Sequence, residues 1–226
     1  LLVTTLVSSV LIVLYRQYTG TLSRQQETLL EGLAQGIDDQ LHTSLDALAG
    51  VALVTPHTTL TDPVAAQRFL SNRTGIQSIF DNGLALFTRT GRLMAETPYD
   101  PDRTIREFAE YPFFKQAFKE DKPIISIPFR STKPPHHPVV QLLAPIKNPS
   151  GATIGFLSGG VRLDQPNFLG SLAQRRVGSS GYLYLYNKDR TMLVHPDPTR
   201  ILGTTALPGV NHLLDRAISG WSGSGT

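Results

Sequence analysis

The feature that most constrains the fold of this chain is an internal repeat. The segment GLALFTRTGRLMAE begins at residue 83 and YLYLYNKDRTMLVH begins at residue 182, so they align without gaps at an offset of 182 − 83 = 99 residues. Each predicts a strand, a four-residue polar turn and a second strand, and Leu84, Leu86, Leu93 and Ala95 alternate inward in the first copy. Because a repeated pattern indicates a repeated structural unit, we expect one strand-rich module to occur twice.

A longer hairpin is predicted downstream of the first copy. The segment VVQLLAPIKNPSGATIGFLSGGVRLD, residues 139–164, holds two apolar strands around the turn residues 148–151, Asn-Pro-Ser-Gly. Gly155, Gly159 and Gly160 weaken the second strand, which indicates a bulge or a close approach of another group to the backbone. We expect this hairpin to complete the first module.

The boundary between the two modules is expected in LDQPNFLGSLAQRRVGSSG, residues 163–181, which includes a short helix around residues 168–175. After the second copy come a loop and the helical pattern GVNHLLDRAIS, residues 209–219, without the strands that would close a second sheet. We therefore predict a first module over residues 57–170 and the start of a second, incomplete one over residues 171–226.

The N-terminus predicts a membrane anchor. Residues 1–15, LLVTTLVSSVLIVLY, are uncharged and apolar, but a spanning helix needs about 20 such residues. The chain lacks an initial Met, and Arg16, Gln17 and Tyr18 resemble an interfacial collar, so we expect a truncated transmembrane helix over residues 1–18. The apolar part of a signal peptide and a buried core helix are the alternatives.

A long stalk helix is predicted over residues 19–56. Apolar residues recur along it every three or four positions, which indicates one continuous apolar face: Leu30, Leu33, Ile37, Leu41, Leu45, Leu48 and Ala52. Such a helix either packs along the domain that follows it or pairs with its copy in a homodimer. Both arrangements stay open, and Pro56 is expected to end the helix.

Composition excludes several classes of function. The net charge of +3 is spread without a run of Lys or Arg that could follow a phosphate backbone, so we expect no nucleic-acid partner. The absence of Cys removes thiol nucleophiles and the commonest zinc sites. Common catalytic motifs such as G-x-S-x-G, the P-loop and H-E-x-x-H are also absent. We therefore expect no catalysis and no cofactor in this segment, and any enzymatic output would belong to another part of a longer protein.

The order of these segments resembles the double Cache sensor domains of bacterial transmembrane receptors. The resemblance covers nearly the whole chain and rests on the N-terminal span, the long helix, EFAEYPFFKQAFKEDKPIISIP, the hairpin of residues 139–164 and VGSSGYLYLYNKDRTMLVHPD. It implies an α+β fold in which a membrane helix and a stalk helix precede two PAS-like antiparallel-sheet modules. It also implies that the sensing region lies outside the cytoplasmic membrane and that the membrane-distal module, residues 57–170, binds the ligand.

In this family a basic residue usually precedes two aromatic residues, a helix and a strand. Pro112, Phe113 and Phe114 match the aromatic part here, whereas Tyr111 stands where many relatives have Arg. The departure puts a carboxylate-bearing ligand in doubt, because a guanidinium binds a carboxylate through two parallel hydrogen bonds and a phenol supplies no charge. Lys115, Arg106 or Arg130 could replace the missing cation only if the backbone directs them inward.

A small-molecule pocket combines apolar walls with a few directed polar groups. The candidate ligand-binding residues are Tyr111, Phe113, Phe114, Lys115, Ser126, Phe129, Arg130, Gln141 and Asp164. Core packing is the better interpretation for Phe114 and for Phe118, four residues later on the same helical face. Tyr111 and Phe113 fit a core or a pocket wall equally. Arg130 is also typical of a solvated surface charge, and Asp164 of a helix cap.

The histidines predict no metal site. His136 and His137 are adjacent in PPHHP, where neighbouring side chains of an extended segment point in opposite directions. His195 precedes Pro196 and Asp197, so a structural role at a turn is favoured over a catalytic one.

We therefore expect an extracytoplasmic ligand-sensing domain of a membrane-anchored bacterial receptor, either a sensor histidine kinase of a two-component system, a diguanylate cyclase or a chemoreceptor. The segment from Tyr111 to Phe129 is expected to form a lid over a small molecule, and its closure would shift the stalk helices. The alternative is a structural or protein-interaction ectodomain without a small ligand, and a secreted enzyme with an unrecognised site is a third possibility.

Overall fold

The computed structural model describes residues 2–178, 180–204 and 207–223, apart from the side chains of residues 1–16, 18 and 19. The chain forms two compact units. One comprises residues 1–39 with 206–226, and the other comprises residues 40–205.

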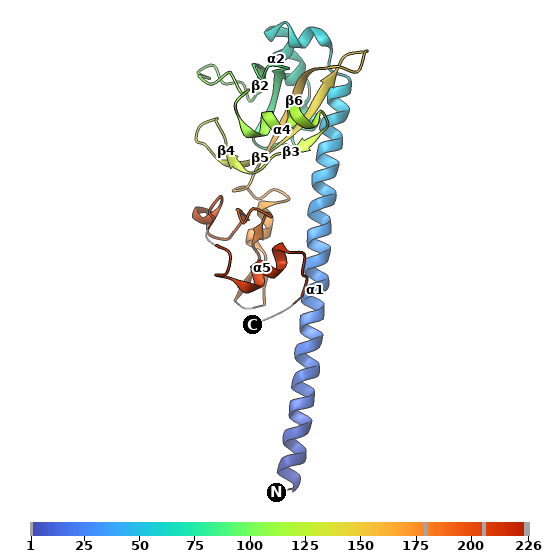
Figure 1. Cartoon of the computed structure of the whole chain (residues 1–226), viewed down its shortest axis with the longest axis vertical. Helices are drawn as coiled ribbons and strands as arrows, with labels where there is room; N and C mark the ends of the chain where they lie inside the picture. Colours follow the sequence, from blue (N-terminus) through green and yellow to red (C-terminus); the bar gives the residue numbers. More distant parts are fainter. Residues whose placement is uncertain (1, 179, 205–206, 224–226) are drawn as a thin grey trace. The chain divides into compact units, whose positions relative to one another are not determined.

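A single helix, α1 (Leu2–Leu53), opens the chain (Figure 1). It contains most of the predicted stalk helix and continues through the residues predicted to cross a membrane. Within the part of the chain that the structure describes, no helix is long and apolar enough to do so. The predicted transmembrane helix of residues 1–18 is therefore not confirmed.

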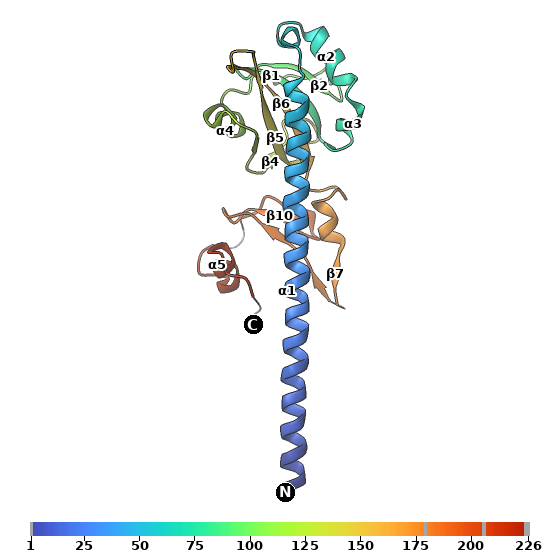
Figure 2. The same ribbon diagram turned by 90° about the vertical axis from the view of Figure 1, so that its right-hand side faces the viewer.

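The apolar face of α1 is buried only near its end. Leu48 and Ala52 are buried in the second unit, whereas Leu29 and Leu30 are about half exposed. Both views of the chain show these last turns beside the six-stranded sheet (Figure 2). Packing against the domain thus accounts for the C-terminal part of the apolar face. The first unit also contains the short helix α5 (His212–Ile218), whose N-cap Asn211 accepts a hydrogen bond from the backbone of Leu214.

The rest of the second unit is rich in strands. In chain order its elements are η1 (His57–Leu60), α2 (Pro63–Ser71), α3 (Thr74–Gln77), β1 (Gly83–Thr88), β2 (Leu93–Thr97), α4 (Pro112–Glu120), β3 (Ile124–Ile125), β4 (Phe129–Arg130), β5 (Pro138–Lys147), β6 (Thr153–Arg162), η2 (Gly170–Gln174), β7 (Arg176–Val177), β8 (Gly181–Tyr182), β9 (Leu185–Tyr186), β10 (Met192–Val194) and η3 (Pro198–Arg200). The predicted α+β class with antiparallel sheets is confirmed.

Six strands form one antiparallel sheet in the order β2-β1-β6-β5-β3, and β4 also pairs with β5. The predicted long hairpin is β5 and β6, in which Val139 to Lys147 pair with Arg162 to Thr153. The remaining described strands form two two-stranded sheets, β7 with β8 and β9 with β10.

The two faces of the large sheet are covered by different segments. Phe87 of β1 and Phe156 of β6 belong to a hydrophobic cluster with α4. The residues next to them on the same strands point to the opposite face of the sheet. On that face a Cβ added at Gly155 would collide with Leu60, and one added at Gly159 would collide with the Phe80 ring. The predicted close approach to the glycines of this strand is confirmed.

The two copies of the sequence repeat form hairpins with the same register. Leu86 pairs with Ala95 and Phe87 with Leu93, and the same pairs recur 99 residues later, Leu185 with Val194 and Tyr186 with Met192. One residue of the second strand is left unpaired in each case, so both hairpins carry a bulge at the same position.

The turns of the two hairpins also correspond. Gly91 has φ +85° and Arg190, 99 residues later, has φ +62°, so both adopt the left-handed conformation. The first turn residue of each copy, Thr88 or Asn187, accepts a backbone hydrogen bond through its side chain from the residue four positions on. This agreement supports the duplication, while the domain limits at residues 57, 170 and 171 remain predictions.

Candidate ligand-binding site

The helix α4 places the aromatic residues against the large sheet. Pro112 occupies its first turn, where a missing N–H costs nothing, and Asp121 ends it with φ 48°, a left-handed C-cap. Phe113, Phe114 and Ala117 fall on one helical face and are buried. The predicted helix is confirmed, and its buried face fixes it to the sheet.

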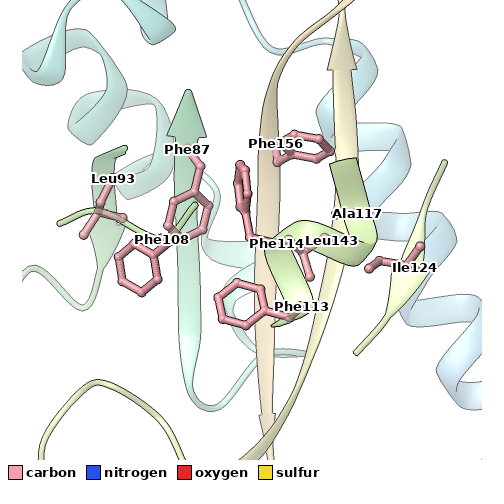
Figure 3. Packing of buried hydrophobic residues seen from close by; sticks show 9 residues of the cluster. All are labelled: Phe87, Leu93, Phe108, Phe113, Phe114, Ala117, Ile124, Leu143 and Phe156. Atoms are coloured by element: carbon pink, nitrogen blue, oxygen red, sulfur yellow. The ribbon is translucent and has the colours of Figure 1, made fainter. Parts of the chain in front are cut away.

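Two neighbouring rings of α4 have different surroundings (Figure 3). Phe114 lies between the rings of Phe87 and Phe156, at centroid distances of 6.0 and 5.1 Å, and is part of a packed core. Phe113 lies 5.0 Å from Phe129 in a stacked arrangement and 6.2 Å from Phe108. The first ring therefore fills the core, and the second is available as a wall.

A small cavity lies beside Phe113. Its volume is about 40 Å³, and its lining includes Ala85 and Gln141 from the sheet and the rings of Phe113 and Phe129. Since about 10–15 Å³ of such volume accommodates one water molecule, the cavity has room for a group the size of about three waters. Such a space is smaller than a typical ligand pocket of about 300–1,000 Å³.

Three charged side chains line the same cavity: Glu96, Arg103 and Lys133. The carboxylate of Glu96 lies 3.7 Å from Nε of Arg103 and 3.4 Å from Nζ of Lys133. The side chains of Glu96 and Arg103 are each only 7% exposed. Charges removed from water to this extent are costly unless they are paired and hydrogen-bonded, so their gathering at one cavity indicates a specialised site.

The hydrogen bonds of this charged group are incomplete. Arg103 donates from Nη2 to Oγ1 of Thr132 at 2.7 Å, and its guanidinium lies 5.5 Å from the Phe108 ring. Among the described residues, Nε and Nη1 of Arg103 and Oε1 of Glu96 are buried without a hydrogen-bond partner. Such atoms are uncommon in folded proteins and call for a functional explanation.

Two loops meet at the lining of the cavity. Arg103 of the 98–111 loop is bonded to Thr132, and Lys133 donates to the backbone carbonyl of Pro98 at 2.9 Å. Outside these contacts lies an open groove of about 740 Å³, which shares Asn82, Arg103, Thr132 and Lys133 with the cavity. The shared residues separate an inner compartment from an outer one, so separation of the loops would open a path between them.

The bulge in β2 explains why Glu96 reaches the cavity. Simple alternation from Leu93 and Ala95 predicts that Glu96 points to solvent. Met94 is unpaired, however, so Leu93 pairs with Phe87 while Glu96 pairs with Ala85, and both pairs face α4. Leu93 and Ala95 are both buried, as predicted, but the unpaired Met94 places them on opposite faces of the sheet and not on one.

Three of the predicted site residues line the cavity: Phe113, Phe129 and Gln141. Two more lie nearby. Tyr111 packs its ring 5.1 Å from Phe108, and the Ser126 hydroxyl accepts a hydrogen bond from the backbone of Gln141 at 2.9 Å.

The other predicted residues face elsewhere. Phe114 is in the core, Lys115 binds Glu110 on the surface at 2.6 Å, and Arg130 is exposed with a long contact to the carbonyl of His136. Phe118, expected to pack with Phe114, is 51% exposed, so that prediction is wrong. The helical face is too narrow to bury both rings against the sheet.

Asp164 belongs to a separate cluster. It accepts hydrogen bonds from Nε of Arg162 at 2.9 Å and contacts Nδ1 of His137 at 2.8 Å. Burial by itself would raise the pKa of Asp164, but the hydrogen bonds from Arg162 and His137 outweigh this and lower it below its ordinary value. The carboxylate is therefore held in an ion-pair network and does not line the cavity.

Sequence reasoning missed Glu96, Arg103 and Lys133. Arg103 and Lys133 lie in loops, where no periodicity reports which way a side chain points. The available signal was the charge-rich segment DPDRTIREFAE, residues 100–110, ahead of the aromatic segment, which by itself does not distinguish a pocket from a solvated surface.

Comparison with known proteins identifies the family. The sequence profile described as dCache_1, Cache domain, matches residues 14–219, and the chain belongs to this family. The predicted family resemblance is confirmed. A search of curated proteins gave no match.

Solved structures of chemoreceptor ligand-binding domains share the fold. The domain of the amino acid chemoreceptor PctC from Pseudomonas aeruginosa PAO1, in complex with GABA, is 20% identical with a TM-score of 0.63, and the match covers 80% of each chain. The domain of CtaA from Pseudomonas fluorescens, in complex with L-isoleucine, is 21% identical with a TM-score of 0.60 over 76% of this chain and 68% of that one. The domain of Mlp24 with asparagine is 18% identical with a TM-score of 0.59 over 83% and 78%. The chain thus belongs to the Cache family and shares its fold with these ligand-binding domains.

Proposed function

We propose that this chain is the extracytoplasmic sensing region of a bacterial transmembrane receptor and that it binds a small molecule in the cavity beside Phe113. The observation that carries the proposal is the buried group of Glu96, Arg103 and Lys133 under an aromatic wall. Apolar walls with a few directed polar groups are typical of small-molecule sites. The relatives whose structures hold GABA, L-isoleucine and asparagine support a small-molecule ligand.

The proposal revises how the site would close. The predicted lid, Tyr111 to Phe129, contains α4, whose Phe113, Phe114 and Ala117 are anchored in the core. The loops that carry Arg103 and Thr132 meet through the hydrogen bonds Arg103–Thr132 and Lys133–Pro98, and their separation would open the cavity. A ligand changes their position only if it binds the open and closed states with different affinity.

The proposal has three further parts. The receptor is attached to the membrane through residues 1–18, forms a homodimer through α1, and has a histidine kinase, diguanylate cyclase or chemotaxis domain as its output. The exposed Leu22, Leu29 and Leu30 of α1 support pairing, because a helix can bury exposed apolar side chains against a copy of itself.

A thermal-shift screen tests the proposal. Carboxylates, amino acids, amines and nucleobases are each added to the protein, and one class is expected to raise the melting temperature reproducibly. The rise should be lost in Phe113→Ala, which removes a cavity wall, and retained in Phe118→Ala, which changes an exposed ring of the same helix. No rise with any class would instead favour an ectodomain that contacts a partner protein.

A further inference from the structure

We propose that the ligand is a small carboxylate without an ammonium group and that Arg103 is the residue that binds it. This inference rests on the proposed function and names the ligand class for the same site. It starts from the free hydrogen-bonding capacity of the cavity. Nε and Nη1 of Arg103 are buried without a hydrogen-bond partner among the described residues, and the side chain lines the cavity.

The geometry of Arg103 suits an anion. A guanidinium presents pairs of N–H groups in one plane, which match the two oxygens of a carboxylate. Nη2 donates to Thr132, and this bond fixes the plane of the group. Nε faces the Glu96 carboxylate at 3.7 Å, so Nη1, which shares an edge of the guanidinium with the second hydrogen of Nη2, is the donor left to a ligand. The Phe108 ring, 5.5 Å from the guanidinium, limits its movement on one side.

The charge balance of the cavity selects among ligands that contain a carboxylate. Arg103 and Lys133 contribute two positive charges and Glu96 one negative charge, so the lining carries a net +1. A monocarboxylate neutralises this charge. A zwitterionic amino acid leaves it uncompensated in a buried place, which is unfavourable.

Asp164 does not supply the missing partner for an ammonium group. Its carboxylate is bound to Arg162 and His137 and is not part of the lining. Glu96 is the one carboxylate among the lining residues, and it lies 3.4 Å from Nζ of Lys133 and 3.7 Å from Nε of Arg103, so an ammonium group bound to it would lie beside two cations.

The size and walls of the cavity set the length of the ligand. Space for a group of about three water molecules in a cavity of about 40 Å³ corresponds to a carboxylate with a very short carbon chain. Phe113 and Phe129 supply apolar contact for that chain. Longer acids would have to extend past Thr132 into the outer groove.

The experiment compares propionate with three molecules of similar size: alanine, which adds an ammonium group, propionamide, which lacks the charge, and propylamine, which reverses it. Isothermal titration calorimetry with the whole chain should show binding of propionate and at least tenfold weaker binding of the other three. Arg103→Gln should raise the Kd of propionate by about 10- to 150-fold, the factor expected for losing a hydrogen bond to a charged group. Arg106→Gln, an exposed arginine of the same loop, is the matched control and should leave it within twofold.

Glu96→Gln separates a binding role from a structural one. Removing this negative charge should tighten propionate binding, because it leaves two cations facing the ligand. If the ligand were an amino acid with its ammonium group on Glu96, the same change would weaken binding.

The outcomes are distinct. Three results would overturn the inference: alanine binding as tightly as propionate, an unchanged Kd in Arg103→Gln, or weaker propionate binding in Glu96→Gln. The proposed sensing function would still stand if another class of molecule bound. Absence of binding by every class in the screen would overturn the proposed function itself. If Arg103→Gln prevented folding, the melting temperature of the variant without ligand would show it. The variant Arg103→Lys would then be tested in its place. It keeps the positive charge but loses the planar pair of donors, and it should still weaken propionate binding at least tenfold.

Discussion

The rings of Phe113 and Phe129 stack with their centroids 5.0 Å apart and their planes inclined by 13°. One ring comes from α4 and the other from the short strand β4, so the contact joins the helix to the edge of the sheet at the wall of the cavity. Offset or inclined aromatic pairs contribute about 0.5–1.5 kcal/mol beyond the area they bury. Adjacent residues of β4 allow this contact to be tested against a matched control.

Phe129→Ala is expected to weaken ligand binding about tenfold or more, because it removes a cavity wall and frees the Phe113 ring. Arg130→Ala changes the next residue, whose side chain is exposed, and is expected to leave the Kd within twofold. Calorimetric titration with whichever ligand the screen identifies measures both values. Equal effects of the two substitutions would contradict the assignment of Phe129 to the cavity.

Phe114→Ala should lower the free energy of unfolding by about 3–5 kcal/mol, since truncating a buried aromatic residue leaves a cavity in the core. Phe118→Ala, four residues later on the same helix, should change it by less than about 1 kcal/mol, because its ring is 51% exposed. Urea denaturation followed by circular dichroism measures the difference. A comparable loss in both variants would mean that α4 buries a different face.

Gly91→Ala is expected to destabilise the first hairpin strongly. Its φ of +85° disfavours any residue with a Cβ, by about 1–2 kcal/mol, and an added Cβ would also lie 2.6 Å from the backbone N of Ala109. Gly151→Ala has the same φ but no atom within 4 Å, so it should show the conformational cost alone. The melting temperature should therefore fall further in Gly91→Ala than in Gly151→Ala. A larger fall in Gly151→Ala would be inconsistent with the packing of the 98–111 loop on the turn.

Asp164→Asn should remove a pH-dependent part of the stability. The pKa of Asp164 is lowered in the folded state from its ordinary value of 3.8. A lowered pKa means that the carboxylate stabilises the fold above the unfolded-state value and that this contribution disappears as the pH falls through the folded-state value. The two proteins should therefore differ at pH 7 by about 1–2 kcal/mol, given a partly exposed, charge-assisted pair. The difference should persist to about pH 5 and shrink below pH 3.8. Urea denaturation across this range measures it, and a difference that grows on acidification would contradict the sign.

The amino-acid sequence by itself determined the local architecture of this protein. The alternation of apolar residues predicted the strands of both hairpins, and the 99-residue repeat extends to the register, the bulge and the left-handed turn residue, Gly91 or Arg190. Local periodicity and turn chemistry act over a few residues, so they can be read without knowledge of the fold.

Tertiary structure alone decided which side chains meet at the cavity. The unpaired Met94 turns Glu96 toward α4, and two loops bring Arg103 and Lys133 within 4 Å of its carboxylate. It also decided that Phe114 is buried while Phe118 is exposed. The physical reason is twofold. A bulge moves every strand residue after it to the opposite face of the sheet. Side chains in loops follow no period, so their direction depends on contacts that form only when distant segments pack together.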